Sequence, residues 1–153
     1  MKTSKTTIIN ATANIVFLWL EDNDRLKQWV PNLVEDEPII ETPEKTGSTF
    51  RQVFLERGKK MEMTGEITDY AENERMRVVM TGDMFNLDVD YILKALAPTQ
   101  TEVTQDTEIK MKGAAKLFAP LVFLMSKFSI SDPQAEAHNR LKEMAEAEYE
   151  RPN

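Results

Sequence analysis

Residues 48–112 alternate between apolar and polar side chains in successive segments, with a turn signal between each segment and the next. The alternation is clearest from Phe85 to Ala97 and recurs in 48–57 and 102–112. Successive side chains of a strand point to opposite faces of a sheet, so each segment predicts a strand. Short turns join consecutive strands in antiparallel order. We therefore expect an antiparallel sheet with one apolar face.

Helical signals stand before and after these strands. Residues 2–9 predict a first strand, and Asn10 or Thr12 can then cap a helix. A second, short helix ends before Pro31, because the residue preceding a proline is pushed out of the helical region. From Gly113 onward the chain predicts one long helix or two helices end to end. Separate runs of strands and helices indicate an α+β fold, with the helices on one face of the sheet.

The C-terminal stretch has an apolar part and a charged part. Leu117 to Phe128 is almost wholly apolar, and we expect it to form one wall of a pocket gripped by the curved sheet. A homodimer contact and a mobile gate over the pocket are the alternatives for this segment. Pro133 can occupy the first position of a helix, which predicts a break near Ser129–Asp132. The charged part has an apolar stripe at Ala137, Leu141, Met144 and Ala145.

Composition excludes several classes of function. The 153 residues predict a single domain over 1–153. A net charge of −7 argues against nucleic acid, whose phosphates require clustered Lys and Arg. The chain has no cysteine, so disulfides and thiolate metal sites are excluded. Met1 to Thr7 is polar, unlike a signal peptide, and the apolar run 117–125 is shorter than the roughly 20 residues of a membrane span. We therefore expect a cytoplasmic protein.

Catalytic and metal-binding patterns are weak. The only histidine, His138, stands among polar neighbours and is expected at the surface. Asp88 and Asp90 share the polar face of a strand and lack the spacing of a calcium loop, so a solvated face is expected. We assign no catalytic residue, metal ligand or cofactor. If the protein is an enzyme, Asp69 or Glu56 is the candidate acid or base.

The inward faces of the predicted strands supply the candidate ligand-binding residues. Many are methionines, which fill cores and also line adaptable apolar pockets, so both interpretations stay open. Gln105 and Thr107 interrupt the apolar face of their strand, and a buried polar group needs a partner such as a ligand. Gln52, Arg51 and Asp69 are further polar candidates. The expected ligand-binding residues are Met61, Met63, Met80, Phe85, Leu87, Gln105, Thr107, Leu121, Met125 and Phe128.

The order of elements resembles the START-like, or SRPBCC, superfamily and its polyketide cyclase/dehydrase-type members. The resemblance rests on loose motifs that span nearly the whole chain, namely 9–17, 24–31 with Leu26, Trp29 and Pro31, 47–52, 65–70 and 141–146. Thr99-Gln100-Thr101 departs from the usual Gly-Thr turn of the family, and 129–133 interrupts the last helix. The resemblance implies a helix-grip fold, a curved antiparallel sheet wrapped around a long C-terminal helix. The superfamily has no shared catalytic residues, so none is transferred.

Three functions follow from this resemblance. The first is binding or carriage of a small hydrophobic or amphipathic ligand, such as a lipid, in a cavity between the sheet and the C-terminal helix. The second is a polyketide cyclase/dehydratase-like enzyme that positions a flexible substrate in the same cavity. The third is a protein-interaction module resembling the chaperone-ATPase activators of the superfamily. The first is our hypothesis, and the other two are alternatives.

Overall fold

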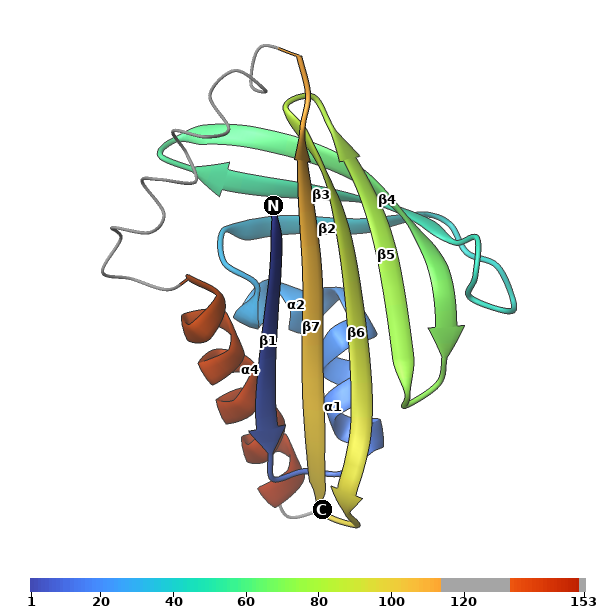
Figure 1. Ribbon diagram of the computed structural model, residues 1–153, viewed down its shortest axis with the longest axis vertical. Coiled ribbons are helices and arrows are strands. Elements are labelled where there is room, and N and C mark those ends of the chain that lie inside the picture. The colour runs from blue at the N-terminus through green and yellow to red at the C-terminus, as the bar shows by residue number, and fades with distance from the viewer. Residues whose placement is uncertain (114–132, 152–153) are drawn as a thin grey trace.

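The computed structural model of the protein describes residues 1–113 and 133–151 and has an α+β fold (Figure 1). In this part of the chain, one antiparallel sheet of seven strands curves around three helices. The elements are β1 (Lys2–Ile9), α1 (Ala13–Glu21), α2 (Asn23–Trp29), β2 (Leu33–Ile40), β3 (Thr49–Glu56), β4 (Lys59–Ala71), β5 (Arg75–Gly82), β6 (Phe85–Ala97), β7 (Gln100–Met111) and α4 (Pro133–Glu150). The predicted α+β class and order of elements are confirmed.

The sheet brings the first strand against the last. Its order is β1-β7-β6-β5-β4-β3-β2, and Thr7 of β1 lies opposite Val103 of β7. Figure 1 shows β6 and β7 running along the long axis of the molecule, whereas β2 and β3 cross over one end of them. This change of direction confirms the predicted curvature and gives the sheet a concave face toward the helices.

The two faces of the sheet differ as the alternation predicts. On β6, Val89 and Tyr91 are buried on the concave face. On the outer face, Asp88 binds Arg77 through two hydrogen bonds of 2.9 and 2.6 Å, and Asp90 binds Arg75 in the same way. The hydrogen bonds from Arg77 lower the pKa of Asp88. The predicted solvated face is confirmed, with arginine as the partner of each carboxylate.

A bulge in β4 breaks the alternation of that strand. Ile67 lies opposite Val78, but the next paired residue is Asp69, opposite Arg77. The extra residue turns Asp69 to the outer face, 3.7 Å from Arg77, and returns Tyr70 to the concave face. Regular alternation would have pointed Asp69 inward.

Helix α4 packs against β1, α1 and α2 through its apolar stripe. Ala137, Leu141 and Ala145 are buried and Met144 is half-buried, which confirms the predicted stripe. Arg25 of α2 donates to Glu148 of α4 at 2.9 Å, so the two helices are also joined by an ion pair. The predicted apolar segment 117–128 and the predicted break at 129–132 lie outside the described residues.

Candidate functional site

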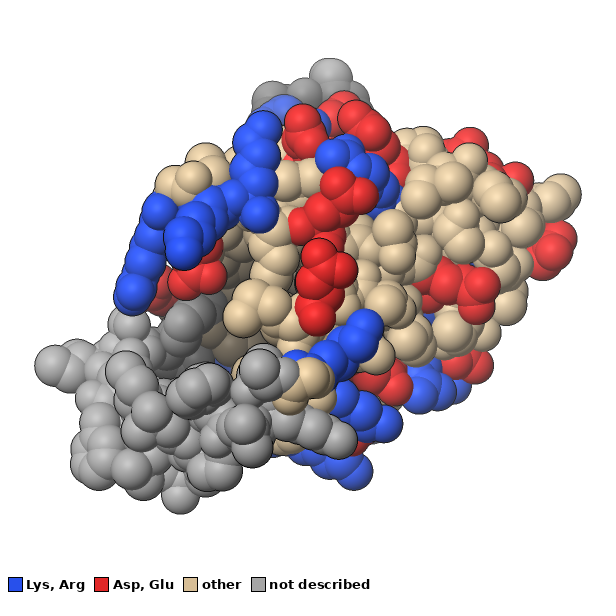
Figure 2. All heavy atoms as spheres, turned by 90° about the horizontal axis from the view of Figure 1, so that it is seen from above, with Lys and Arg blue, Asp and Glu red and all other residues tan. Residues whose placement is uncertain are grey.

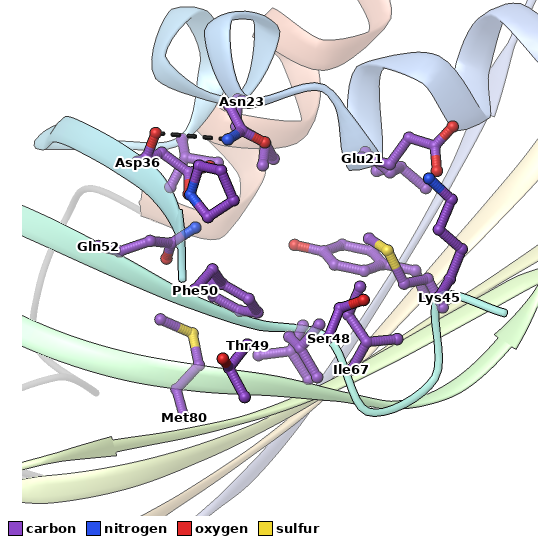
Figure 3. Close-up of a pocket in the computed structure, with 18 of the residues that line it drawn as sticks. Glu21, Asn23, Asp36, Lys45, Ser48, Thr49, Phe50, Gln52, Ile67 and Met80 are labelled. Atoms are coloured by element: carbon purple, nitrogen blue, oxygen red, sulfur yellow. Dashed lines mark hydrogen bonds between the residues drawn. The ribbon is translucent and has the colours of Figure 1, made fainter. Parts of the chain in front are cut away.

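A pocket of about 290 Å³ lies between the concave face of the sheet and helices α1 and α2 (Figure 3). Its described walls come from α1, α2, strands β2 to β7 and the loop 41–48. We predicted a cavity between the sheet and the C-terminal helix. In the described part of the chain, α1 and α2 form the helical side of the pocket instead of α4.

Most of the pocket surface is apolar. Because side chains alternate along a strand, every second side chain of β3, β5 and β6 points into the pocket. Residues of α1 and α2 form the opposite side of the pocket. Such a surface suits a ligand with an apolar body. The apolar lining residues are Leu20, Leu26, Val30, Pro38, Ile40, Phe50, Phe54, Ile67, Met76, Val78, Met80, Leu87 and Val89.

One side of the pocket carries a carboxylate that is half-buried. Asp36 of β2 lies beside Gln52 of β3, because these residues are opposite each other in the strand pairing (Figure 3). Burial raises the pKa of Asp36 to about 6, although a hydrogen bond from Gln52 and the charge of Lys27 lower it. Gln52 itself is only 8% exposed. The pair places hydrogen-bonding groups in a mainly apolar surface.

Figure 3 shows Glu21 and Lys45 on the other side of the pocket. The hydroxyl of Tyr70 donates to Glu21 Oε2 at 2.7 Å. Burial and this hydrogen bond raise the pKa of Tyr70, so the phenol keeps its proton. Tyr91 lines the pocket as well, with its ring 6.3 Å from that of Trp29 in an edge-on contact.

A part-buried polar chain connects the pocket to α4. Gln105 lines the pocket and donates to Thr107 Oγ1 at 3.2 Å, while its amide oxygen lies 2.8 Å from His138 Nε2. The other ring nitrogen of His138 lies 2.7 Å from Thr7 Oγ1. His138 is only 1% exposed, so our prediction of a surface histidine is wrong. It shares a helix face with Leu141 and Ala145, at spacings of three and seven residues.

The predicted ligand-binding residues occupy different places. Met80, Leu87, Gln105 and Thr107 line the pocket. Met63 is buried in the core, whereas Met61 and Phe85 are half-buried against it, and none of these three lines the pocket. Leu121, Met125 and Phe128 lie outside the described residues.

The polar candidates also separate into two groups. Gln52 lines the pocket, but Arg51 lies on the outer face, 3.1 Å from Glu62. Asp69 is turned outward by the bulge, and Glu56 is exposed near the end of β3, so neither carboxylate reaches the pocket. Sequence reasoning missed Asp36, Glu21 and Tyr70. Asp36, Pro38 and Ile40 alternate along β2, and this signal could have placed Asp36 on the pocket face.

The described residues contain no cluster of three or more His, Cys, Asp or Glu side chains that could hold a metal ion. None of the described helices is both long and apolar enough to cross a membrane. Figure 2 shows Lys and Arg interspersed with Asp and Glu over the face seen from above, instead of a continuous basic surface. The pocket is therefore the feature of the described structure most suited to a ligand.

A strongly curved antiparallel sheet, helices on its concave side and an apolar pocket between them define a helix-grip protein of the START-like class. The sequence profile of one family, described as "Polyketide cyclase / dehydrase and lipid transport", matches residues 1–144. The chain belongs to this family, as the resemblance predicted. No curated protein sequence matches the chain significantly.

Solved structures show the same fold at low sequence identity. The Zhui aromatase/cyclase from a Streptomyces species has a TM-score of 0.77 and 14% identity, covering 95% of this chain and 93% of its own. A START superfamily protein from Mycobacterium smegmatis has a TM-score of 0.72 and 19% identity, covering 97% of both chains. A Thermus thermophilus protein has a TM-score of 0.74 and 16% identity, covering 97% of this chain and 99% of its own.

Proposed function

We propose that the protein binds a small amphipathic molecule non-covalently in the pocket between the sheet and helices α1 and α2. The supporting observation is the composition of that pocket. Its walls are mainly aliphatic, methionine and phenylalanine side chains, and a few polar groups converge on it from opposite sides. Such a combination is typical of sites that bury the apolar body of a ligand and orient it through one polar group. The family description includes lipid transport, which agrees with this role.

Filling the pocket tests this proposal. Leu87 lines the pocket, and Ile92, on the opposite face of the same strand, is exposed. Leu87→Trp should abolish binding of anilinonaphthalene sulfonate and of decanol, whereas Ile92→Trp should leave binding unchanged. Both are measured by fluorescence titration and thermal shift, with native mass spectrometry to detect a ligand that copurifies with the wild type. Equal binding by the two variants, or no binding by the wild type, would overturn the proposal.

Catalysis of the cyclase or dehydratase type is the second candidate, and Asp36 is the observation that favours it. A carboxyl with a pKa of about 6 can accept and return a proton near neutral pH, as a general acid–base must. The aromatase/cyclase among the structural neighbours has the same fold. The test is turnover of a short poly-β-ketone thioester, followed by mass spectrometry. If catalysis is the function, Asp36→Asn should lose turnover at least a hundredfold while retaining substrate binding.

The protein-interaction alternative has less support, because that function would be favoured by a filled core and an exposed apolar patch. The described structure has a pocket, and most of its apolar lining is buried or half-buried, with Pro38 and Ile40 the exposed members.

A further inference from the structure

The charges around the pocket are predominantly negative. Among the described lining residues, Glu21, Asp36 and Glu41 are acidic and Lys45 is the only basic residue. Lys45 and Glu41 are exposed and lie in the loop 41–48. An anionic ligand, such as a fatty acid with its carboxylate inside the pocket, would meet like charge there.

The acidic lining residues differ in their hydrogen-bond and ion-pair partners. Glu21 accepts a hydrogen bond from Tyr70 at 2.7 Å. Asp36 has the Gln52 amide as a partner but no ion pair in the described part of the chain. Lys27, whose charge lowers the pKa of Asp36, is 3.3 Å from Asp24. Asp36 is therefore a half-buried lining carboxylate whose negative charge is not neutralised by an ion pair in the described part of the chain.

The orientation of Gln52 adds a second acceptor. A carboxylate can only accept a hydrogen bond, so the Gln52 group that lowers the pKa of the neighbouring Asp36 carboxyl is its NH₂ group. The amide oxygen of Gln52 is then available to accept another hydrogen bond. Asn23 is on helix α2, which faces this strand, and its Nδ2 atom lies 3.5 Å from the main-chain oxygen of Asp36. A carboxylate and an amide oxygen thus lie together at the edge of an apolar cavity.

We propose that Asp36 and Gln52 form a head-group site for an amphipathic amine, with its ammonium group against the Asp36 carboxylate and its apolar body over Phe50 and Met80. An ammonium group has three donors and a positive charge, which match the two acceptors and the unneutralised carboxylate. Figure 3 shows Phe50 and Met80 on the same side of the cavity as Gln52. This inference rests on the proposed ligand-binding function and specifies the chemical class of the ligand.

The test compares three compounds with one naphthyl body and different head groups: naphthylmethylamine, naphthylmethanol and naphthoate. Their affinities are measured by isothermal titration calorimetry at about pH 7.5, where the Asp36 carboxyl is ionised. We expect the amine to bind at least tenfold more tightly than naphthoate, with the alcohol between them. A half-buried charge pair in an apolar surrounding gives an effect of this order.

Two variants identify the carboxylate responsible. Asp36→Asn keeps the shape of the side chain and removes its charge, so it should weaken binding of the amine at least tenfold and leave the alcohol within twofold. Glu37→Gln changes the net charge equally on the outer face of the same strand, where Glu37 lies 3.5 Å from Arg51, and should change none of the three affinities. The comparison of compounds on the wild type does not depend on either variant being folded.

The outcomes separate the two proposals. Equal affinity of the wild type for the three compounds, or tighter binding of naphthoate, overturns the inference and leaves ligand binding by the pocket in place. An equal loss of amine binding in Asp36→Asn and Glu37→Gln also overturns it, because the effect would then be one of net charge. Binding of none of the three compounds overturns both proposals.

Discussion

His138 Nε2 lies 2.8 Å from the amide oxygen of Gln105, which joins the C-terminal helix to a residue of the pocket wall. Gln105 lies on the middle of β7 and His138 is near the start of α4, so the contact joins two elements that are separated along the chain. Thr7 of β1 completes the arrangement through the other ring nitrogen. The side chain of Gln105 is thus oriented by α4, although no residue of this helix lines the described pocket.

Replacement of His138 tests this connection. His138→Phe retains the ring volume but removes both ring nitrogens, leaving Thr7 and the Gln105 oxygen without these buried partners. We expect the free energy of unfolding to fall by roughly 2–3 kcal/mol, because each buried group left unpaired costs about 1–3 kcal/mol. Urea denaturation measures the change. Asn139→Ala, at the exposed neighbouring position, should change stability by less than about 0.5 kcal/mol, and an equal effect of both variants would contradict a structural role for the histidine.

The Asp36 carboxyl should make stability depend on pH. Its pKa is raised by burial to about 6 in the folded protein, so the folded state holds this proton more tightly than the unfolded chain does. Stability from this group is therefore greatest below about pH 4 and falls as the pH rises to about 6. Asp36→Asn removes the titration. The free energy of unfolding of Asp36→Asn minus that of the wild type should increase by on the order of 1 kcal/mol from about pH 4 to pH 7. This value already includes a reduction for solvent screening.

Denaturant unfolding of Asp36→Asn and wild type at both pH values measures this difference, with Glu37→Gln as the matched control. A relative stability of Asp36→Asn that does not change with pH would show that Asp36 has an ordinary pKa.

Gly65 should control the size of the pocket. A Cβ at this position would lie 2.3 Å from Cζ of Phe50, whose ring lies across the glycine and lines the pocket. Gly65→Ala must displace the Phe50 ring, and we expect a loss of about 1–3 kcal/mol in stability together with altered affinity for the naphthyl compounds. Thr64→Ala, on the exposed side of the same strand, is the control. Unchanged binding in Gly65→Ala would show that the ring moves without affecting the cavity.

The two tryptophans should differ in their contribution to stability. Trp29 Nε1 donates to the carbonyl oxygen of Trp19 at 2.8 Å, whereas Trp19 Nε1 is buried without a hydrogen-bond partner in the described structure. Trp29→Phe loses a buried hydrogen bond, but Trp19→Phe removes an unsatisfied donor. Trp29→Phe should therefore destabilise the protein by about 1–2 kcal/mol more than Trp19→Phe, as measured by chemical denaturation. The reverse order would contradict this assignment.

Local patterns were sufficient to predict the sheet and the order of its elements. Period-two alternation depends on which side of one strand is buried, and it placed Leu87, Gln105 and Thr107 on the concave face. The position of Asp69 could not be obtained in this way, because the bulge in β4 is fixed by pairing with β5. One inserted residue reverses the face of every residue that follows it.

The residues missed at the site depend on contacts between distant parts of the chain. Glu21 lines the pocket and accepts a hydrogen bond from Tyr70, 49 residues later in the chain. Asp36 belongs to a short strand next to β3, and its burial follows from Gln52 and the facing helix. His138 was judged by its polar neighbours in sequence, although its spacing to Leu141 was already that of a buried helix face. Helical spacing therefore predicts the burial of His138 better than the polarity of its sequence neighbours does.

Pro38 has a consequence for self-association. β2 is an edge strand of the sheet, and the register of its pairing with β3 shifts between Pro38 and Ile40. A strand edge with free N–H groups can recruit a strand from a second molecule. Pro38 has no N–H to offer, and the irregularity beside it disturbs the row of acceptors, so this edge is a poor template for aggregation. The same short strand that carries Asp36 can therefore border an open pocket without inviting intermolecular β-sheet growth.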